Sequence, residues 1–175
     1  ISMCNVNTPI STNNGTQFLK TFARTSVMLS TGVGQLSASA TMNQCYFEGT
    51  IDTEGSEVVT LYAGGAVANT TSESNTVEIS EVISNADLLV GCASTTTLYA
   101  GGLVGFANNI KVSYSAAWGR IVPITSDSAE NIYAGGMFGC VKTSATVNNS
   151  YTLVNVIADS IASSALANLK INALV

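Results

Sequence analysis

The chain has 175 residues, which is enough for one domain with a sizeable core. Hydrophobic residues make up 46% of it, charged residues only 10%, and the formal net charge is −5, a composition that disfavours intrinsic disorder. The six basic residues are scattered and the longest apolar runs fall far short of the roughly 20 residues of a membrane span, so we expect no nucleic-acid partner and no membrane span in this segment.

The N-terminal part gives the least defined signal. The chain begins at Ile1 without an initiator Met and without a signal-peptide profile. Residues 16–24 carry apolar side chains at 18, 19, 22 and 23, which is the spacing of a helical face. We expect either a short helix packed on the domain or a degenerate strand there. We also expect the whole chain to be a segment of a longer repeat protein.

The clearest feature is a motif that recurs three times. It reads LYAGGAVA at 61–68, LYAGGLVG at 98–105 and IYAGGMFG at 132–139, with spacings of 37 and 34 residues between successive tyrosines. A fainter copy, LSTGVG at 29–34, lies 32 residues before the first. Such self-similarity at a near-constant period indicates a repeat architecture.

A second element precedes each copy of the motif. It reads NQCYFEGTI at 43–51, SEVISNADL at 80–88 and SYSAAWGRI at 113–121, and NNSYTLVNV at 148–156 begins a fourth unit. The shared theme is Ser or Cys before Tyr, then Gly or a small residue, then an aliphatic residue. Tyr, Val and Ile favour strands. The third copy aligns with about two extra residues, which places Trp118 in an insertion.

These repeats predict an all-β fold: a β-solenoid, or β-helix, of about 34–37 residues per repeat. We expect a single domain over residues 1–175 with clear repeats at about 30–158. The glycine pair permits positive φ or close backbone approach where the coil turns. An antiparallel sandwich is the competing fold, but it does not require the same residues to recur. One wide coil or two narrow coils per repeat both remain open, and one coil per repeat would give about five coils.

Two segments lie outside the motifs. Residues 69–76 (NTTSESNT) are polar and acidic, and we expect a loop at one edge of a coil. Residues 161–171 are expected to be a decayed repeat, with LANL at 166–169 in the place of Tyr-Ala-Gly-Gly. Neither end of the chain resembles the polar cap that solenoids need, so we expect either a fragment or a chain whose ends stack on something else.

The motifs resemble the GLUG repeat, whose pattern is Asn-x-Ser-Tyr-x-x-Gly-x-Val, a spacer and then Gly-Gly-Leu-Val-Gly. Residues 101–105 match its second half, 46–51 match its Tyr-x-x-Gly-x-Val core, and 149–151 match its start. The chain departs from the pattern at Ala66, Ala68, Ile83 and Val154. The resemblance implies a β-solenoid in large secreted or surface-attached bacterial or protist proteins, where the repeats form spacer or adhesive stalks. It implies no catalytic residues.

Four cysteines, Cys4, Cys45, Cys92 and Cys140, are spaced by 41, 47 and 48 residues. The chain has no CxxC motif and no histidine, so a zinc site is excluded. Two disulfides in an oxidising compartment and four small buried hydrophobes are both compatible with this pattern. The redox state therefore stays open.

The sequence offers little for catalysis. The carboxylates are dispersed, the lack of histidine leaves no base for a nucleophile, and SxxK and GxGxxG are absent. Asp52 and Asp87 could neighbour each other on adjacent coils and hold Ca²⁺, against the simpler interpretation of solvated loop charges. We predict that the chain is not an enzyme and has no cofactor and no metal site.

Binding is the remaining class. Tyr62, Tyr99 and Tyr133 would form a column that stacks on sugars if it faces outward, or a buried column if it faces inward. Trp118 could anchor a partner or lie buried under a loop. Asn69, followed by Thr70 and Thr71, is the best candidate for N-glycosylation among three acceptor patterns.

The sequence therefore predicts a non-catalytic structural or adhesive protein, a surface stalk or filament-forming module at an extracellular or cell-surface location. Its partner would be a protein or a second copy, bound through coil ends or edge loops, or a glycan. The alternatives are a carbohydrate-binding or polysaccharide-cleaving β-helix and an intracellular scaffold.

Overall fold

The computed structural model describes residues 5–7, 10–11, 24–37, 39–53, 58–72, 74–91, 95–125 and 129–172. Strands make up 68% of these residues, and the helical segment among them is one short 3-10 turn, η1 (Leu166–Asn168). The strands are β1 (Asn5–Asn7), β2 (Ile10–Ser11), β3 (Arg24–Ser30), β4 (Val33–Leu36), β5 (Thr41–Asp52), β6 (Val58–Gly64), β7 (Val67–Thr70), β8 (Val77–Val90), β9 (Thr97–Gly101), β10 (Val104–Ala107), β11 (Ile110–Ser113), β12 (Ala116–Pro123), β13 (Asn131–Gly135), β14 (Phe138–Val141), β15 (Ala145–Asn148), β16 (Tyr151–Val156) and β17 (Leu169–Asn172).

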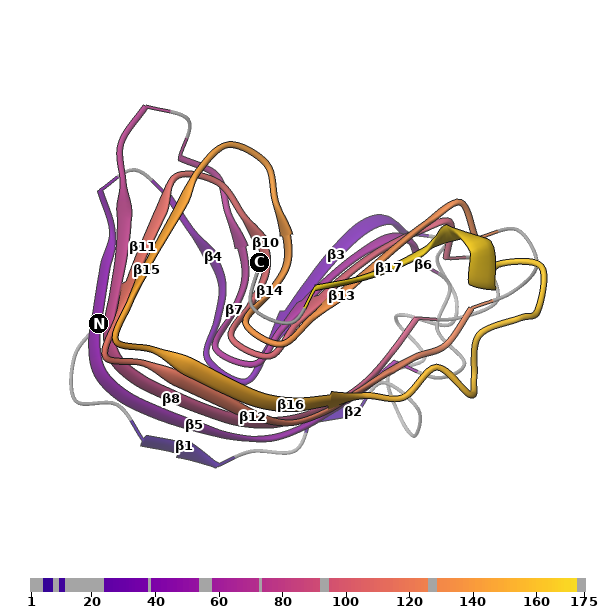
Figure 1. Ribbon diagram of the computed structural model, residues 1–175, viewed down its shortest axis with the longest axis horizontal. Coiled ribbons are helices and arrows are strands. Elements are labelled where there is room, and N and C mark those ends of the chain that lie inside the picture. The colour runs from indigo at the N-terminus through magenta and orange to yellow at the C-terminus, as the bar shows by residue number, and fades with distance from the viewer. Residues whose placement is uncertain are drawn as a thin grey trace.

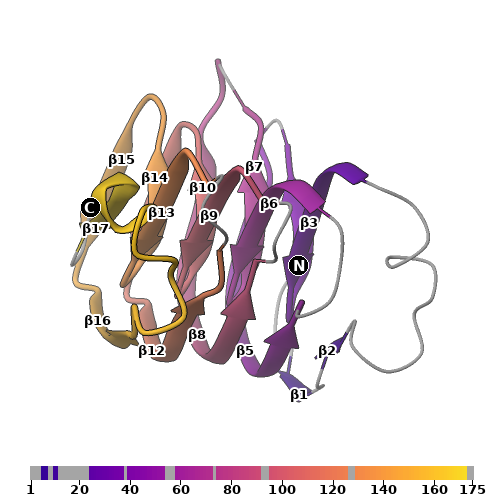
Figure 2. The same cartoon turned by 90° about the vertical axis from the view of Figure 1, so that its right-hand side faces the viewer.

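The strands wind into a parallel β-solenoid of about four turns. Its coils lie side by side along the axis in Figure 2. Sheet A contains β1, β2, β5, β8, β11, β12, β15 and β16, sheet B contains β3, β6, β9, β13 and β17, and sheet C contains β4, β7, β10 and β14. Each turn of the chain passes through all three sheets, as the end-on view shows (Figure 1). Because successive repeats pair directly, each repeat makes one coil. We expected about five coils, and the structure has about four, because the regular repeat occupies only part of the chain.

The ladders between coils confirm the main register of the repeats. Tyr62 pairs with Tyr99 and Tyr99 with Tyr133, each within a parallel ladder that also aligns the neighbouring Ala and Gly residues. The fainter N-terminal copy is corrected by two residues. Met28, and not a residue within 29–34, lies opposite the first tyrosine, because strand β3 pairs Val27 with Leu61 and Met28 with Tyr62.

The expected insertion in the third copy of the second element is wrong. Ala116 pairs with Ile83 and Ile121 with Leu88, five residues apart on both strands, so no extra residue lies between them. Tyr114 therefore is not the counterpart of Tyr46; that place in the column belongs to Ala116. Trp118 lies within β12, opposite Asn85.

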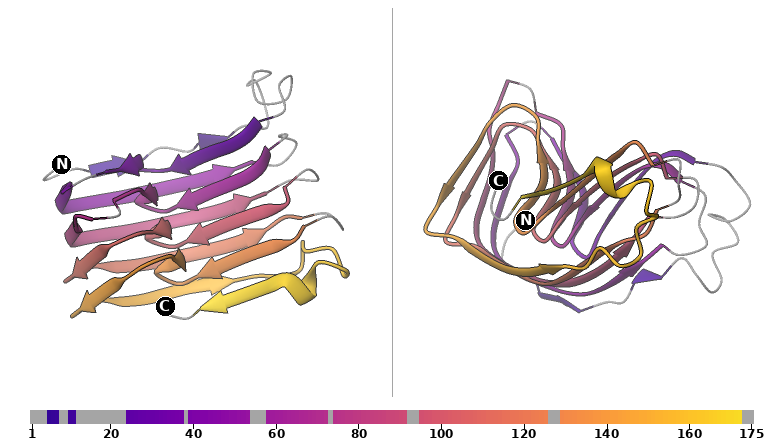
Figure 3. Two further views of the ribbon diagram at one scale, coloured as in Figure 1. Left: turned by 90° about the horizontal axis from the view of Figure 1, so that it is seen from above. Right: turned by 45° about the vertical axis from the view of Figure 1, so that its right-hand side comes forward.

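The core runs the length of the solenoid in two clusters. One lies between sheet C and the first part of sheet A and includes Met42, Phe47 and Phe138. The other lies between sheet B and the second part of sheet A, with columns such as Leu61, Leu98 and Ile132 that are fully buried. The left panel of Figure 3 shows the rungs of these sheets stacked in order along the axis.

Sheet A bends at one corner that is repeated in every coil. Four successive coils place a residue with positive φ there: Gln44 (54°), Glu81 (55°), Tyr114 (50°) and Asn149 (49°). In three of these coils the side chain of the residue after the bend donates a hydrogen bond to the carbonyl two residues earlier: Cys45 to Asn43 (3.3 Å), Ser115 to Ser113 (2.8 Å) and Ser150 to Asn148 (2.8 Å). A Ser or Cys therefore holds the corner in these three coils, and Val82 takes this place in the remaining one.

The glycine pair allows close approach of backbone between sheets B and C. A Cβ on Gly101 would lie 1.9 Å from the Val104 carbonyl oxygen and 2.6 Å from the Gly139 nitrogen. A Cβ on Gly102 would lie 2.3 Å from the Gly136 carbonyl oxygen. Neither of these glycines has positive φ. The sequence left two roles open for these glycines, positive φ and close backbone approach. Close approach is the one that requires glycine here.

The loop expected at residues 69–76 is shorter than predicted. Residues 69 and 70 belong to strand β7, so the loop starts only at Thr71. The decayed C-terminal repeat is confirmed with a shift of four residues, because Lys170 of β17, and not Leu166, pairs with Tyr133 of β13. The short helix or degenerate strand expected at 16–24 lies outside the described residues except Arg24, which begins β3. Across the described chain, no helix has the length and apolarity needed to cross a membrane.

Replacing Gly101 with Ala is expected to lower the free energy of unfolding by about 3 kcal/mol, since the new methyl group meets backbone atoms that cannot rotate away. Gly34→Ala is the matched control, because its Cβ would have its nearest neighbour, the Met28 carbonyl oxygen, at 3.9 Å. Chemical denaturation followed by circular dichroism compares the two. Equal destabilisation by both substitutions would contradict the crowding argument.

Candidate binding surfaces

The tyrosine column faces outward from sheet B. Tyr62, Tyr99 and Tyr133 are half-buried, whereas the flanking Leu61 and Ala63 point into the core. Adjacent rings stack with centroids 5.1 Å apart and interplanar angles of 13° and 14°. Of the two orientations that the sequence leaves open, the structure has the outward one.

Both faces of these rings are occupied along most of the column. Tyr99 lies between Tyr62 and Tyr133, and the Lys170 ammonium lies 4.7 Å from the Tyr133 ring centroid and donates to its hydroxyl at 3.2 Å. Phe106, on the outer side of sheet C, meets Tyr62 and Tyr99 edge-on at 5.7 and 4.9 Å across the V-shaped turn visible in Figure 1. Sugar stacking needs a free ring face, so this column offers a partner mainly ring edges and hydroxyl groups.

Burial raises the pKa values of two acidic groups in and beside the tyrosine column, the Tyr99 hydroxyl and the Cys140 thiol. Burial raises the pKa of the Tyr99 hydroxyl above its usual value, and Tyr62, Cys140 and Tyr133 add to the rise. Burial also raises the pKa of the Cys140 thiol, while the Lys170 ammonium acts in the opposite direction. Both groups are therefore held in their neutral forms. This corner favours packing over acid–base or nucleophilic chemistry.

Trp118 belongs to a second aromatic group on the outer side of sheet A. Its side chain is half-buried and stacks on Tyr151 of the next coil, with ring centroids 6.1 Å apart. Tyr151 is 53% exposed and Leu153 is 73% exposed. Trp118 therefore does not lie under a loop, and it remains a candidate contact for a partner.

Two ion pairs cross from the second to the third complete coil on the outer side of sheet A. Arg120 Nε lies 3.0 Å from Asp87 Oδ2, and Lys111 Nζ lies 3.6 Å from Glu78 Oε1. Both pairs are well exposed and contribute little to stability. They were missed in the sequence because their partners are 33 residues apart and meet only once the register is known.

The proposed Asp52–Asp87 pair is corrected by the register. Ile51 pairs with Leu88 as expected, but Asp87 lies opposite Thr50 and Asp52 lies opposite Leu89. The carboxylate of Asp87 is engaged by Arg120 instead. Within the described residues, no cluster of three or more His, Cys, Asp or Glu side chains could hold a metal ion.

Asn69 is not in an exposed loop. It lies in strand β7 with only 7% of its surface exposed, and its amide nitrogen is 4.0 Å from the Met28 sulfur. A glycan could therefore join Asn69 only before β7 takes its place in sheet C. Glycosylation at this position stays a prediction.

Two of the four cysteines lie in the described part of the chain. Cys45 is buried at the corner of sheet A, where its thiol donates to the Asn43 carbonyl. Cys140 carries a half-buried thiol in β14. Cys4 and Cys92 lie outside the described residues, so the disulfide pattern stays open.

A third outer surface was not foreseen from the sequence. We call it the polar face; it consists of three adjacent columns of side chains on the first part of sheet A. The columns are Thr41, Glu78, Lys111 and Thr146; Asn43, Ser80, Ser113 and Asn148; and Gln44, Glu81, Tyr114 and Asn149. Alternating polar residues in these strands were a possible signal, but only the stacking brings them together.

The fold defines the class of this protein as a parallel β-solenoid. Comparison of the chain with protein-family models, with curated proteins and with solved structures finds no match. Its function must therefore be argued from the surfaces described above.

Tyr99 is expected to titrate above the ordinary tyrosine pKa of about 10. Because the folded state favours the neutral phenol, Tyr99 contributes stability below the unfolded pKa, and this contribution is lost as pH rises through the raised folded pKa. The difference in phenolate absorbance between the wild type and Tyr99→Phe isolates this group. In concentrated guanidinium chloride the midpoint should return to about 10, and a native midpoint no higher than the denatured one would refute the shift.

Proposed function

We propose that this protein is a non-catalytic structural or adhesive repeat module that acts as a surface stalk or filament-forming element in an extracellular setting. The main support for this proposal is the in-register parallel pairing of successive coils. Sheet B alone stacks five strands along one axis. Such a stack behaves as a rod, since each coil is held by backbone ladders to both neighbours.

The last coil supports self-association. Its inward-facing residues Val141, Val147, Val154 and Val156 are only partly buried, because no further described strand covers them. Leu153 and Ile171, on the same coil, are 73% and 53% exposed. Edge strands with apolar neighbours favour pairing with another chain. This end therefore suits a protein partner or a second copy.

The chemistry of the outer surfaces favours a non-catalytic role. The Asp87 and Glu78 carboxylates are engaged by Arg120 and Lys111, and the chain contains no histidine. Glycosidases and lyases need paired acidic groups or an acid and a base at a cleavage site. The resemblance to GLUG repeats supports the extracellular setting. A carbohydrate-binding role is the second candidate, and the polar face favours it; a polysaccharide-cleaving β-helix and an intracellular scaffold are less well supported.

Self-association through the last coil is tested by analytical ultracentrifugation over a range of concentrations. We expect assemblies heavier than the 18.0 kDa chain, and we expect Leu153→Asp combined with Ile171→Asp to weaken association about tenfold or more, since charges would replace apolar contacts. Val59→Asp is the matched control, because Val59 is also exposed (39%) but lies in β6, three strands away from β17 in sheet B. If the chain stays monomeric at every concentration, the proposal that it forms filaments is rejected, and the proposal that it is a stalk is kept.

Adhesion without cleavage is tested with beads that carry the full chain. The beads should be retained under flow on surfaces coated with extracellular proteins or polysaccharides. The same polysaccharides, incubated with the soluble chain, should release no new reducing ends. Time-dependent release would contradict the non-catalytic assignment, and beads that adhere to none of these surfaces would contradict the adhesive one.

A further inference from the structure

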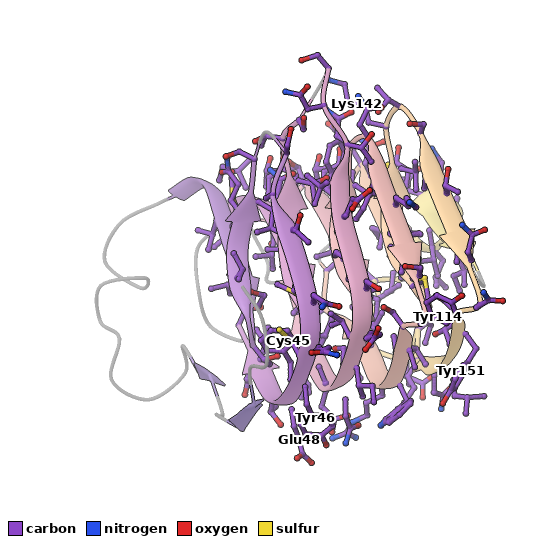
Figure 4. The ribbon with its side chains drawn as sticks, turned by 90° about the vertical axis from the view of Figure 1, so that its left-hand side faces the viewer. Cys45, Tyr46, Glu48, Tyr114, Lys142 and Tyr151 are labelled. Carbon is purple, nitrogen blue, oxygen red and sulfur yellow. The ribbon has the colours of Figure 1, made fainter. Side chains whose placement is uncertain are left out.

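The polar face is a continuous surface on one side of the solenoid, formed by β5, β8, β11 and β15. Figure 4 views the molecule from this side, with Tyr114 at the lower end of the face, near the bend of sheet A. Eleven of its twelve column positions are Ser, Thr, Asn, Gln, Glu or Lys, and Tyr114 is the exception. This composition separates it from the tyrosine column of sheet B.

The polar face is hollowed between its first two columns of side chains, on β5, β8 and β11. A depression of about 340 Å³ lies among Thr41, Asn43, Glu78, Ser80, Lys111 and Ser113. Within it Ser113 donates its hydroxyl hydrogen to Ser80 at 3.2 Å, and Lys111 lies beside Glu78. The hollow therefore presents hydroxyl, amide, carboxylate and ammonium groups together, so that donors and acceptors alternate over a short distance.

The charges of this face restrict the ligand. Lys111 is offset by Glu78, and Glu81 adds one further negative charge, so the three charged groups sum to −1. A phosphate or an acidic sugar would meet no net positive charge, and an apolar ligand would leave the polar lining without partners. A neutral, polyhydroxylated molecule satisfies the donors and acceptors without bringing a charge.

Tyr114 supplies an aromatic contact beside the hollow. It follows Ser113 directly in the chain and is 63% exposed, the most exposed aromatic side chain among the described residues. Its φ of 50° places it at the corner of the coil, in a conformation that a bulky residue adopts at a cost. Unlike the stacked rings of Tyr62, Tyr99 and Tyr133, its ring can accept the apolar face of a sugar.

We propose that the polar face binds neutral carbohydrate. One sugar unit would occupy the hollow, with hydrogen bonds to Asn43, Ser80 and Ser113, and the adjoining unit would lie on Tyr114. Because neighbouring coils repeat similar side chains about 4.8 Å apart, an oligosaccharide running along the solenoid axis would meet further polar groups at Thr146 and Asn148. This inference rests on the proposed adhesive function and names the ligand class for it.

The test uses the full chain and a panel of neutral tetra- to hexasaccharides built from glucose, mannose, galactose or N-acetylglucosamine. Binding is first detected on an array and then measured by isothermal titration. Tyr114→Asn keeps a residue type suited to positive φ, as Asn149 is in the same column. This variant should weaken binding about tenfold, the loss expected for one aromatic contact. Ser80→Ala combined with Ser113→Ala should weaken it by a similar factor.

Tyr151→Asn is the matched control, since Tyr151 is similarly exposed (53%) and lies on the same sheet but outside the polar face. It should leave the affinity unchanged, and circular dichroism should show all variants folded. The proposal is overturned if no neutral oligosaccharide binds, if only acidic ones bind, or if Tyr151→Asn weakens binding as much as Tyr114→Asn. Beads that still adhere to protein-coated surfaces in any of these cases would preserve the adhesive function and reject only its carbohydrate ligand.

Discussion

Parallel backbone pairing between successive coils is the constraint on which the rest of this structure depends. Pairing within each sheet places the residues of a strand over their counterparts one turn away. Tyr62 pairs with Tyr99 in sheet B, and Ser80 pairs with Ser113 in sheet A at a different sequence offset, because the connections between the strands differ in length. The core, the tyrosine column and the polar face are all consequences of these alignments. A slip by one residue would turn every side chain to the opposite side of its sheet.

The sequence was sufficient for the fold because identical residues mark the register. The Tyr-Ala-Gly-Gly copies and the aliphatic positions Ile51, Leu88 and Ile121 predicted which residues stack, and the ladders agree. It was not sufficient where different residue types share one backbone conformation. Gln44, Glu81 and Tyr114 have no common side chain, yet all three have positive φ at the corner. The misaligned third repeat, and with it the misplaced Trp118, follows from that hidden equivalence.

The candidate surfaces were harder to predict than the fold for a related reason. Whether a side chain is accessible depends on the path of the whole coil, as Asn69 shows: it belongs to a polar run, but β7 brings it against Met28. The polar face combines residues about 33 to 37 positions apart that are unremarkable within their own segments. The tyrosines were correctly expected to form a column, but their mutual stacking, which covers the ring faces, depends on an interplanar angle that a sequence does not encode directly.

One coil per repeat also sets how far such a protein can reach. Each turn consumes 34 to 37 residues, on the evidence of the tyrosine spacings, and advances the axis by only about 4.8 Å. A reach of about 100 Å would then take about 20 turns, or on the order of 700 residues. An extended single strand would span that distance with about 30 residues. The solenoid thus uses many residues per unit of length, and in return it is broad and rigid. Every added turn extends the outer surfaces by one more row of side chains.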